Sequence, residues 1–218
     1  MNKASEKVLD LVKEGKISPE EGDQLLSAMD SSKGRFWQML FHPFERLSSK
    51  TTVGIAFVVA LCGLALSRWS IRFDGALDLH INIAPVVWRV AFIEQVVAWP
   101  LTAISLWGLA KVLHKQTRLS DFIGFVGAAR LPLLLAAVSL VLVVQNPQFT
   151  QTYQSFTQFS FLLLVGVTLP WYCWFITLLF NAYKVASGIR GRRLIVSFIV
   201  GIFLAETISK IGLWITLW

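Results

Sequence analysis

Four charged side chains of this sequence stand inside long apolar stretches, where a charge is costly. They are Glu94, Arg130, Glu206 and Lys210. An Arg at the centre of a membrane-spanning helix costs about 2.5–3.5 kcal/mol on insertion scales, so each such group needs a partner or a wet cavity. The chemistry open to them is ion pairing within a helical bundle, or the binding of an ion, a proton or a small solute.

Approximate depths indicate which of these charges meet. At a rise of about 1.5 Å per residue, Arg130 and Glu206 lie about 12 and 18 Å from the cytoplasmic ends of their helices. Glu94 and Lys210 both fall at about 24 Å by the same count. The depths favour the cross-helix pairs Arg130–Glu206 and Glu94–Lys210. Alternatively, Glu206 and Lys210 pair within one helix, because they are four residues apart in the favourable order. Glu94 would then pair with Arg130 or Gln95, or be partly protonated.

Two interpretations of the four charges follow. The first is a structural ionic clamp that holds the bundle together. The second is an intramembrane polar site for an ion, a proton or a small solute. Pro100, Pro132 and Pro170 are candidate helix kinks that would open backbone groups towards such a cavity.

The composition predicts a membrane protein with a polar head. Of the 218 residues, 55% are hydrophobic and 15% are charged, which is too apolar for a soluble domain of this length. About half of the charged side chains fall within the first 50 residues. Basic residues of the remaining body gather in short loops, so the net charge of +7 indicates membrane topology and not nucleic-acid binding.

We predict an all-α membrane protein with five transmembrane helices, because five apolar stretches approach or exceed about 20 residues. They cover residues 51–69, 90–113, 122–144, 159–183 and 194–217. Lys and Arg concentrate before the first stretch and in the second and fourth loops, whereas the third loop, residues 145–158, has no charge. The positive-inside rule then places the N-terminus in the cytoplasm and the C-terminus outside, in a multi-pass protein of the inner (cytoplasmic) membrane.

Residues 1–30 are predicted to form a cytoplasmic helical hairpin. Gly15 stands where a first helix would end, and Ser18 followed by Pro19 starts a second one. The stretch Glu14–Glu21 (E-G-K-I-S-P-E-E) resembles the short SHOCT-like hairpins attached to many bacterial membrane proteins. The resemblance implies docking of a protein partner or self-association through residues 1–30. A solubilising appendage is the alternative.

Residues 31–50 are predicted to be a linker and an interfacial amphipathic helix that lead into a membrane domain at residues 51–218. The linker is the polar stretch 30–34, and Phe36, Leu40, Phe41, Phe44 and Leu47 then form one apolar stripe. The alternative is a soluble helix packed on the head.

The loop that follows the first apolar stretch, residues 70–84, alternates apolar and polar side chains around Asp74-Gly75. This pattern predicts a β-hairpin. Its expected role is to cap the outer mouth of the bundle, and binding of an external partner is the alternative. His80 with Asp74 and Asp78 is too sparse a set for us to predict a metal site.

The stretch Val126–Pro132 (V-G-A-A-R-L-P), together with the five-span layout, resembles the Yip (Ypt/Rab-interacting protein) domain family in its bacterial branch. Sequences around Trp99-Pro100 and Leu169-Pro170 add a weak parallel repeat of two helix pairs after a single first helix. The resemblance implies a cytoplasmic N-terminus and a role in export or envelope-stress systems. The acidic and aromatic motif of eukaryotic members is not recognisable, so binding of prenylated GTPases is not implied.

No hydrolytic or redox arrangement is visible, because His42, His80 and His114 are far apart and no H-E-x-x-H motif or phosphate-binding glycine loop occurs. We therefore expect no enzyme, no catalytic residue, no cofactor and no metal. The expected function is a membrane scaffold or accessory protein that recruits partners through its hairpin. A small permease for an ion, a proton or a solute is the alternative.

Overall fold

The structure is a computed structural model that describes residues 3–82, 85–114, 116–144 and 158–217. It divides into two compact units, residues 1–43 and 44–218, which are described separately. Most of the uncharged third loop (145–157) and the end of the expected hairpin (83–84) lie outside the described residues. The elements in chain order are α1 (Lys3–Lys13), α2 (Pro19–Phe41), η1 (Pro43–Glu45), α3 (Ser49–Leu66), η2 (Ser67–Trp69), β1 (Ile71–Arg72), β2 (His80–Ile81), α4 (Trp88–Leu113), α5 (Leu119–Ala129), α6 (Leu131–Val144), α8 (Gln158–Ser187) and α9 (Arg192–Leu217).

The first unit contains the predicted helical hairpin. Ser18 caps α2: its Oγ accepts a hydrogen bond from the Glu21 N–H at 3.1 Å, and its own N–H donates to Glu21 Oε2 at 2.9 Å. This capping box satisfies N–H groups that a helix start leaves without a partner. Gly15, with φ of +67°, makes the turn after α1. A Cβ at Gly22 would come within 2.5 Å of Val12 Cγ2, so the two helices pack closely there.

Helix α2 is longer than predicted and runs without interruption from Pro19 to Phe41. It passes through residues 30–34, where a linker was expected. Of the predicted apolar stripe, Phe36 is exposed, and the neighbouring Trp37 and Met39 are exposed as well. The Trp37 ring stacks on Phe41 with centroids 5.8 Å apart.

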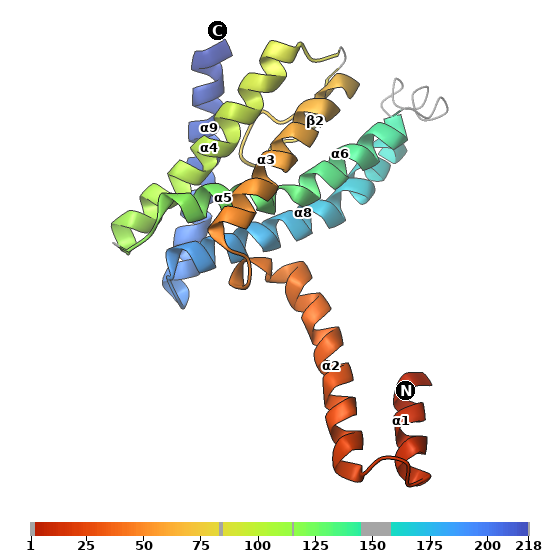
Figure 1. Cartoon of the computed structure of the whole chain (residues 1–218). Helices are drawn as coiled ribbons and strands as arrows, with labels where there is room; N and C mark the ends of the chain where they lie inside the picture. Colours follow the sequence, from red (N-terminus) through yellow and green to blue (C-terminus); the bar gives the residue numbers. More distant parts are fainter. Residues whose placement is uncertain (1–2, 83–84, 115, 145–157, 218) are drawn as a thin grey trace. The chain divides into compact units, whose positions relative to one another are not determined.

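Among its described residues, the second unit contains five helices long and apolar enough to cross a membrane, as predicted (Figure 1). They cover Ser49–Trp69, Trp88–Leu113, Leu119–Val143, Leu162–Ser187 and Arg192–Leu217. Many of their large apolar side chains are exposed, among them Phe57, Phe92 and Phe203. Exposed apolar surface on several helices suits contact with lipid.

The described helices of the second unit pack in three main pairs, and glycines allow close approach in two of them. Helix α4 lies mainly against α9, α3 against α5, and α6 against α8 (Figure 1). On α9, a Cβ at Gly201 would come within 2.8 Å of Leu106 of α4; on α5, a Cβ at Gly124 would come within 2.5 Å of Thr52 of α3. Helices in membranes approach closely at such positions. The expected grouping into two consecutive helix pairs is therefore not the main packing, because α9 packs on α4 far more than on α8.

The third apolar span is broken in the middle. Helix α5 ends at Ala129 and α6 begins at Leu131, with Arg130 between them. The Arg130 N–H bonds to the Gly127 carbonyl at 3.2 Å, a tight turn, and Pro132 has no N–H to continue the α5 ladder. Pro100 and Pro170, by contrast, lie inside α4 and α8, which continue through them.

Candidate functional site

The predicted loop hairpin forms and inserts into the bundle. Residues 70–82, called here the β1–β2 hairpin, pair antiparallel, with Ile71 opposite Ile81 and Arg72 opposite His80. Alternating side chains of a strand point to opposite faces. One face of the hairpin is buried, and its members are Ile71, Phe73, Ala76 and Leu79. The hairpin therefore packs among the helices of the second unit, and its role as a cap of the outer mouth stays a prediction.

Glu94 of α4 holds the base of the hairpin. Its side chain is fully buried. Arg72 Nε donates a hydrogen bond to Glu94 Oε1 at 2.6 Å, and Arg72 Nη2 forms an ion pair with the same oxygen. The Phe73 N–H donates to the other oxygen, Oε2, at 3.2 Å. Both oxygens of this buried carboxylate are thus engaged by the hairpin, as a buried charge requires.

Helix α9 holds the tip of the hairpin. Glu206 Oε2 accepts a hydrogen bond from the Leu77 N–H at 2.9 Å, and Ser209 Oγ accepts one from the Ala76 N–H at 3.1 Å. Lys210 Nζ donates to Asp78 Oδ2 at 2.6 Å. Three neighbouring residues of the tip are therefore bound by one face of α9.

Gly75 makes this approach possible. A Cβ at Gly75 would lie 2.7 Å from Glu206 Oε1, which is closer than real Cβ contacts allow. The Asp-Gly pair that predicted a turn therefore has a second role, because only glycine leaves room for the Glu206 carboxylate.

Arg130 lies beneath the hairpin at the break between α5 and α6. Its side chain is buried, and its guanidinium carbon is 5.8 Å from the centroid of the Phe73 ring, a cation–π arrangement. The charge of Glu94 also acts favourably on it. Among the described residues, no hydrogen-bond partner reaches Arg130 Nη2.

The predicted site residues come together, but around the hairpin and not in the predicted pairs. Glu94 pairs with Arg72 instead of Lys210, and Lys210 pairs with Asp78. Arg130–Glu206 is not among the ion pairs of the described residues. The alternative within one helix is present, with Lys210 Nζ 3.5 Å from Glu206 Oε1. Arg72 and Asp78 lie in the hairpin, outside the helices from which the depths were counted, so the depths could not indicate these partners.

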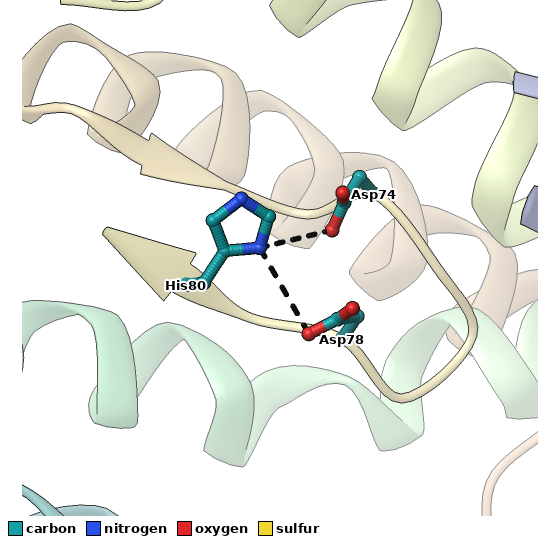
Figure 2. Close-up of side chains that lie close together, drawn as sticks. All are labelled: Asp74, Asp78 and His80. Carbon is teal, nitrogen blue, oxygen red and sulfur yellow. Dashed lines mark ion pairs between the residues drawn. The ribbon is translucent and has the colours of Figure 1, made fainter. Parts of the chain in front are cut away.

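The hairpin also brings together Asp74, Asp78 and His80, the set that was too sparse in the sequence to predict a metal site (Figure 2). His80 Nδ1 lies 3.2 Å from Asp74 Oδ1 and 3.9 Å from Asp78 Oδ1. One ligand atom from each of the three lies within 4.8 Å of the others. The signal was the two-residue spacing of Asp78 and His80, which puts both side chains on one face of a strand, opposite Asp74 across the turn.

The described part of the second unit defines a helical protein with five candidate membrane spans. By its first unit, residues 6–34 match the family described as the SHOCT-like domain, which confirms the resemblance of the hairpin. That match does not extend into the membrane body and gives no support to the Yip resemblance. Comparison with curated proteins and comparison with solved structures gave no match.

Proposed function

We propose that this protein is a non-enzymatic scaffold or accessory protein of the inner membrane, which recruits a partner or a second copy through its SHOCT-like hairpin. The observation that carries the proposal is the match at residues 6–34, on a compact unit that precedes an apolar five-helix body. A hairpin of this size buries little core of its own. Docking on another protein surface would bury more of its apolar side chains and so stabilise it.

The proposed orientation places the hairpin in the cytoplasm and the C-terminus outside. Its support is the distribution of Lys and Arg over the loops. The exposed Phe36 and Trp37 of α2 suit an aromatic contact with the headgroup layer. The proposed class is Yip-like, in export or envelope-stress systems, and it rests on the Val126–Pro132 stretch and the five-span layout alone.

The membrane body supports an anchoring role. Glu94, Glu206 and Lys210 bind the β1–β2 hairpin, so these charges stabilise one arrangement of the bundle. A membrane body stabilised in this way suits a protein that contacts its partner elsewhere, through residues 6–34.

Crosslinking in membranes tests the proposal. Deletion of residues 1–32 should leave insertion intact and abolish both the crosslinked partner species and co-purification of two differently tagged copies. Gly22→Leu should do the same, because its side chain would collide with Val12 and separate the two helices of the hairpin. Glu14→Gln, which removes only an exposed ion pair with Lys16, is the matched control. Unchanged crosslinking in the deletion variant would refute recruitment by the hairpin.

A small permease is the second candidate, and one observation favours it. The third span is broken at Arg130, whose buried Nη2 has no hydrogen-bond partner among the described residues. Broken helices and buried unpaired charges mark solute sites in transporters. Solute or proton flux into reconstituted vesicles should then be lost in Arg130→Gln and kept in Lys184→Gln, which alters an exposed ion pair with Glu45. Absence of flux across a broad panel of ions and solutes excludes this candidate.

A further inference from the structure

The Asp74, Asp78 and His80 cluster presents three electron-pair donors to one point. Figure 2 shows both carboxylates turned towards the imidazole Nδ1. The three residues come from both arms of the β1–β2 hairpin: Asp74 follows β1, Asp78 precedes β2 and His80 lies in β2. When Nδ1 carries no proton, three electron-pair donors this close repel one another unless a cation lies between them.

One of these atoms has no donor. Asp74 Oδ1 is inaccessible to solvent, and among the described residues it receives no hydrogen bond. A buried carboxylate oxygen without a donor is costly and calls for an explanation. His80 Nδ1 lies 3.2 Å from it, at a distance but not an alignment suited to a hydrogen bond.

The local charge is also unbalanced. Asp74, Asp78 and Glu206 carry three negative charges around the tip of the hairpin, and Lys210 supplies one positive charge to them. Arg72 does not correct the imbalance, because it is paired with Glu94. The excess of two negative charges is neutralised by one divalent cation.

The distances suit a small transition-metal ion. Zinc binds imidazole nitrogen and carboxylate oxygen at about 2.0–2.2 Å, so ligand atoms around a tetrahedral ion lie about 3.3–3.5 Å apart. The separations of 3.2 and 3.9 Å from His80 Nδ1 bracket this value. Mg²⁺ and Ca²⁺ prefer sites made only of oxygen, whereas imidazole selects zinc and its neighbours in the transition series.

Lys210 holds one side of the cluster, and a hollow lies beside it. Lys210 engages Asp78 through Oδ2, which leaves Oδ1 facing His80. A hollow of about 220 Å³, lined in part by Asp74, Lys210 and Trp214, lies beside it.

From this geometry we propose that Asp74, Asp78 and His80 bind one divalent transition-metal ion of the zinc type. The ion bridges the two arms of the β1–β2 hairpin and locks it in the bundle. The site is independent of the recruitment proposed for residues 6–34.

Titration of the full-length, metal-free protein in detergent with Zn²⁺ tests the site. Calorimetry should give one saturable site per chain and a higher melting temperature. His80→Gln should weaken the affinity by at least about tenfold, since even the loss of groups that only support a ligand costs 10–100-fold. His114→Gln, at the opposite end of α4, is the matched control and should bind normally. Lys210→Gln should bind Zn²⁺ more tightly, because Asp78 is freed from a competing cation.

A measurement on the unaltered protein avoids variants that fail to fold. Zn²⁺ should protect His80, but not the exposed His114, from carbethoxylation, as read by peptide mass spectrometry. Mg²⁺ at the same concentration should protect neither. No saturable Zn²⁺ binding, equal protection by Mg²⁺, or unchanged affinity in a folded His80→Gln protein would overturn the proposal.

Discussion

At the scale of single residues, the decisive group is the Glu94 carboxylate. It is fully buried, and among the described residues the hairpin supplies its hydrogen-bond partners, Arg72 and the Phe73 N–H. Breaking a buried pair is far more costly than never having formed it, because the remaining charge stays desolvated. The stability of this region should therefore depend on both members of the pair together.

A double-mutant cycle measures that dependence. Arg72→Ala and Glu94→Ala should each lower the free energy of unfolding in detergent, by up to about 3–5 kcal/mol. The double variant should lose less than the sum, because no orphan charge remains. Strict additivity, read from denaturant or thermal unfolding, would contradict the pairing.

The pair that depth alone favoured serves as the comparison. Arg130→Ala and Glu206→Ala should be additive in the same assay, since the two groups contact different parts of the hairpin. A coupling above about 0.5 kcal/mol would show that they interact after all.

The sequence revealed which residues would carry the buried charge but not their partners. Glu94, Arg130, Glu206 and Lys210 stand out because charge is rare in apolar helices. Their partners could not be predicted, because tertiary packing places the hairpin in the bundle. Counting residues along a helix does not show how deep a loop inserts. Arg72 and Asp78 look like ordinary loop charges until the loop is seen between α4 and α9.

At the scale of elements, glycines set the distance between helices. A Cβ at Gly127 of α5 would collide with Ala56 of α3 and lie within 2.6 Å of the Trp99 ring of α4. Trp99 also donates its indole N–H to the Ile123 carbonyl at 3.0 Å, which fixes α4 on α5. Three helices thus meet where a side chain has no room.

Gly127→Ala should therefore lower the melting temperature in detergent, with a loss of about 1–3 kcal/mol expected for overpacking. Gly108→Ala in α4 is the matched control, because nothing lies within 4 Å of the added methyl group. Alanine is the better helix former, so the control should be neutral or slightly stabilising. A melting temperature unchanged in Gly127→Ala would show that α3 and α5 are not tightly packed.

Long, strongly apolar helices were predictable, and their ends were less so. The five spans follow from hydropathy and length. The prediction of a linker at residues 30–34 was wrong. Asp, Ser and Lys each cost a helix less than about 1 kcal/mol, and no proline in this stretch ends the helix. The packing partners were also missed, because a pattern along the chain shows where glycines lie but not which helix they face.

At the scale of the whole molecule, orientation is the property on which the proposed function depends. An odd number of spans puts the two termini on opposite sides of a membrane. A phosphatase fused after Trp218 should be active only outside the cytoplasm, and the same reporter at the N-terminus should be inactive. Reversing the charge of Arg190, Arg192 and Arg193 should weaken this preference, because they supply much of the positive charge of the fourth loop. An active N-terminal fusion would place the SHOCT-like hairpin on the wrong side for a cytoplasmic partner.

The order in which the β1–β2 hairpin acquires its contacts also shapes biogenesis. Arg72 meets Glu94 only 22 residues later in the chain, but Leu77 and Asp78 wait 129 and 132 residues for Glu206 and Lys210. While the ribosome makes the intervening helices, the tip of the hairpin has no α9 to bind. The contacts of the tip with α9 therefore form only after the last helix has been made. Chains that end before that point leave the Ala76 and Leu77 N–H groups and the Asp78 carboxylate without these partners.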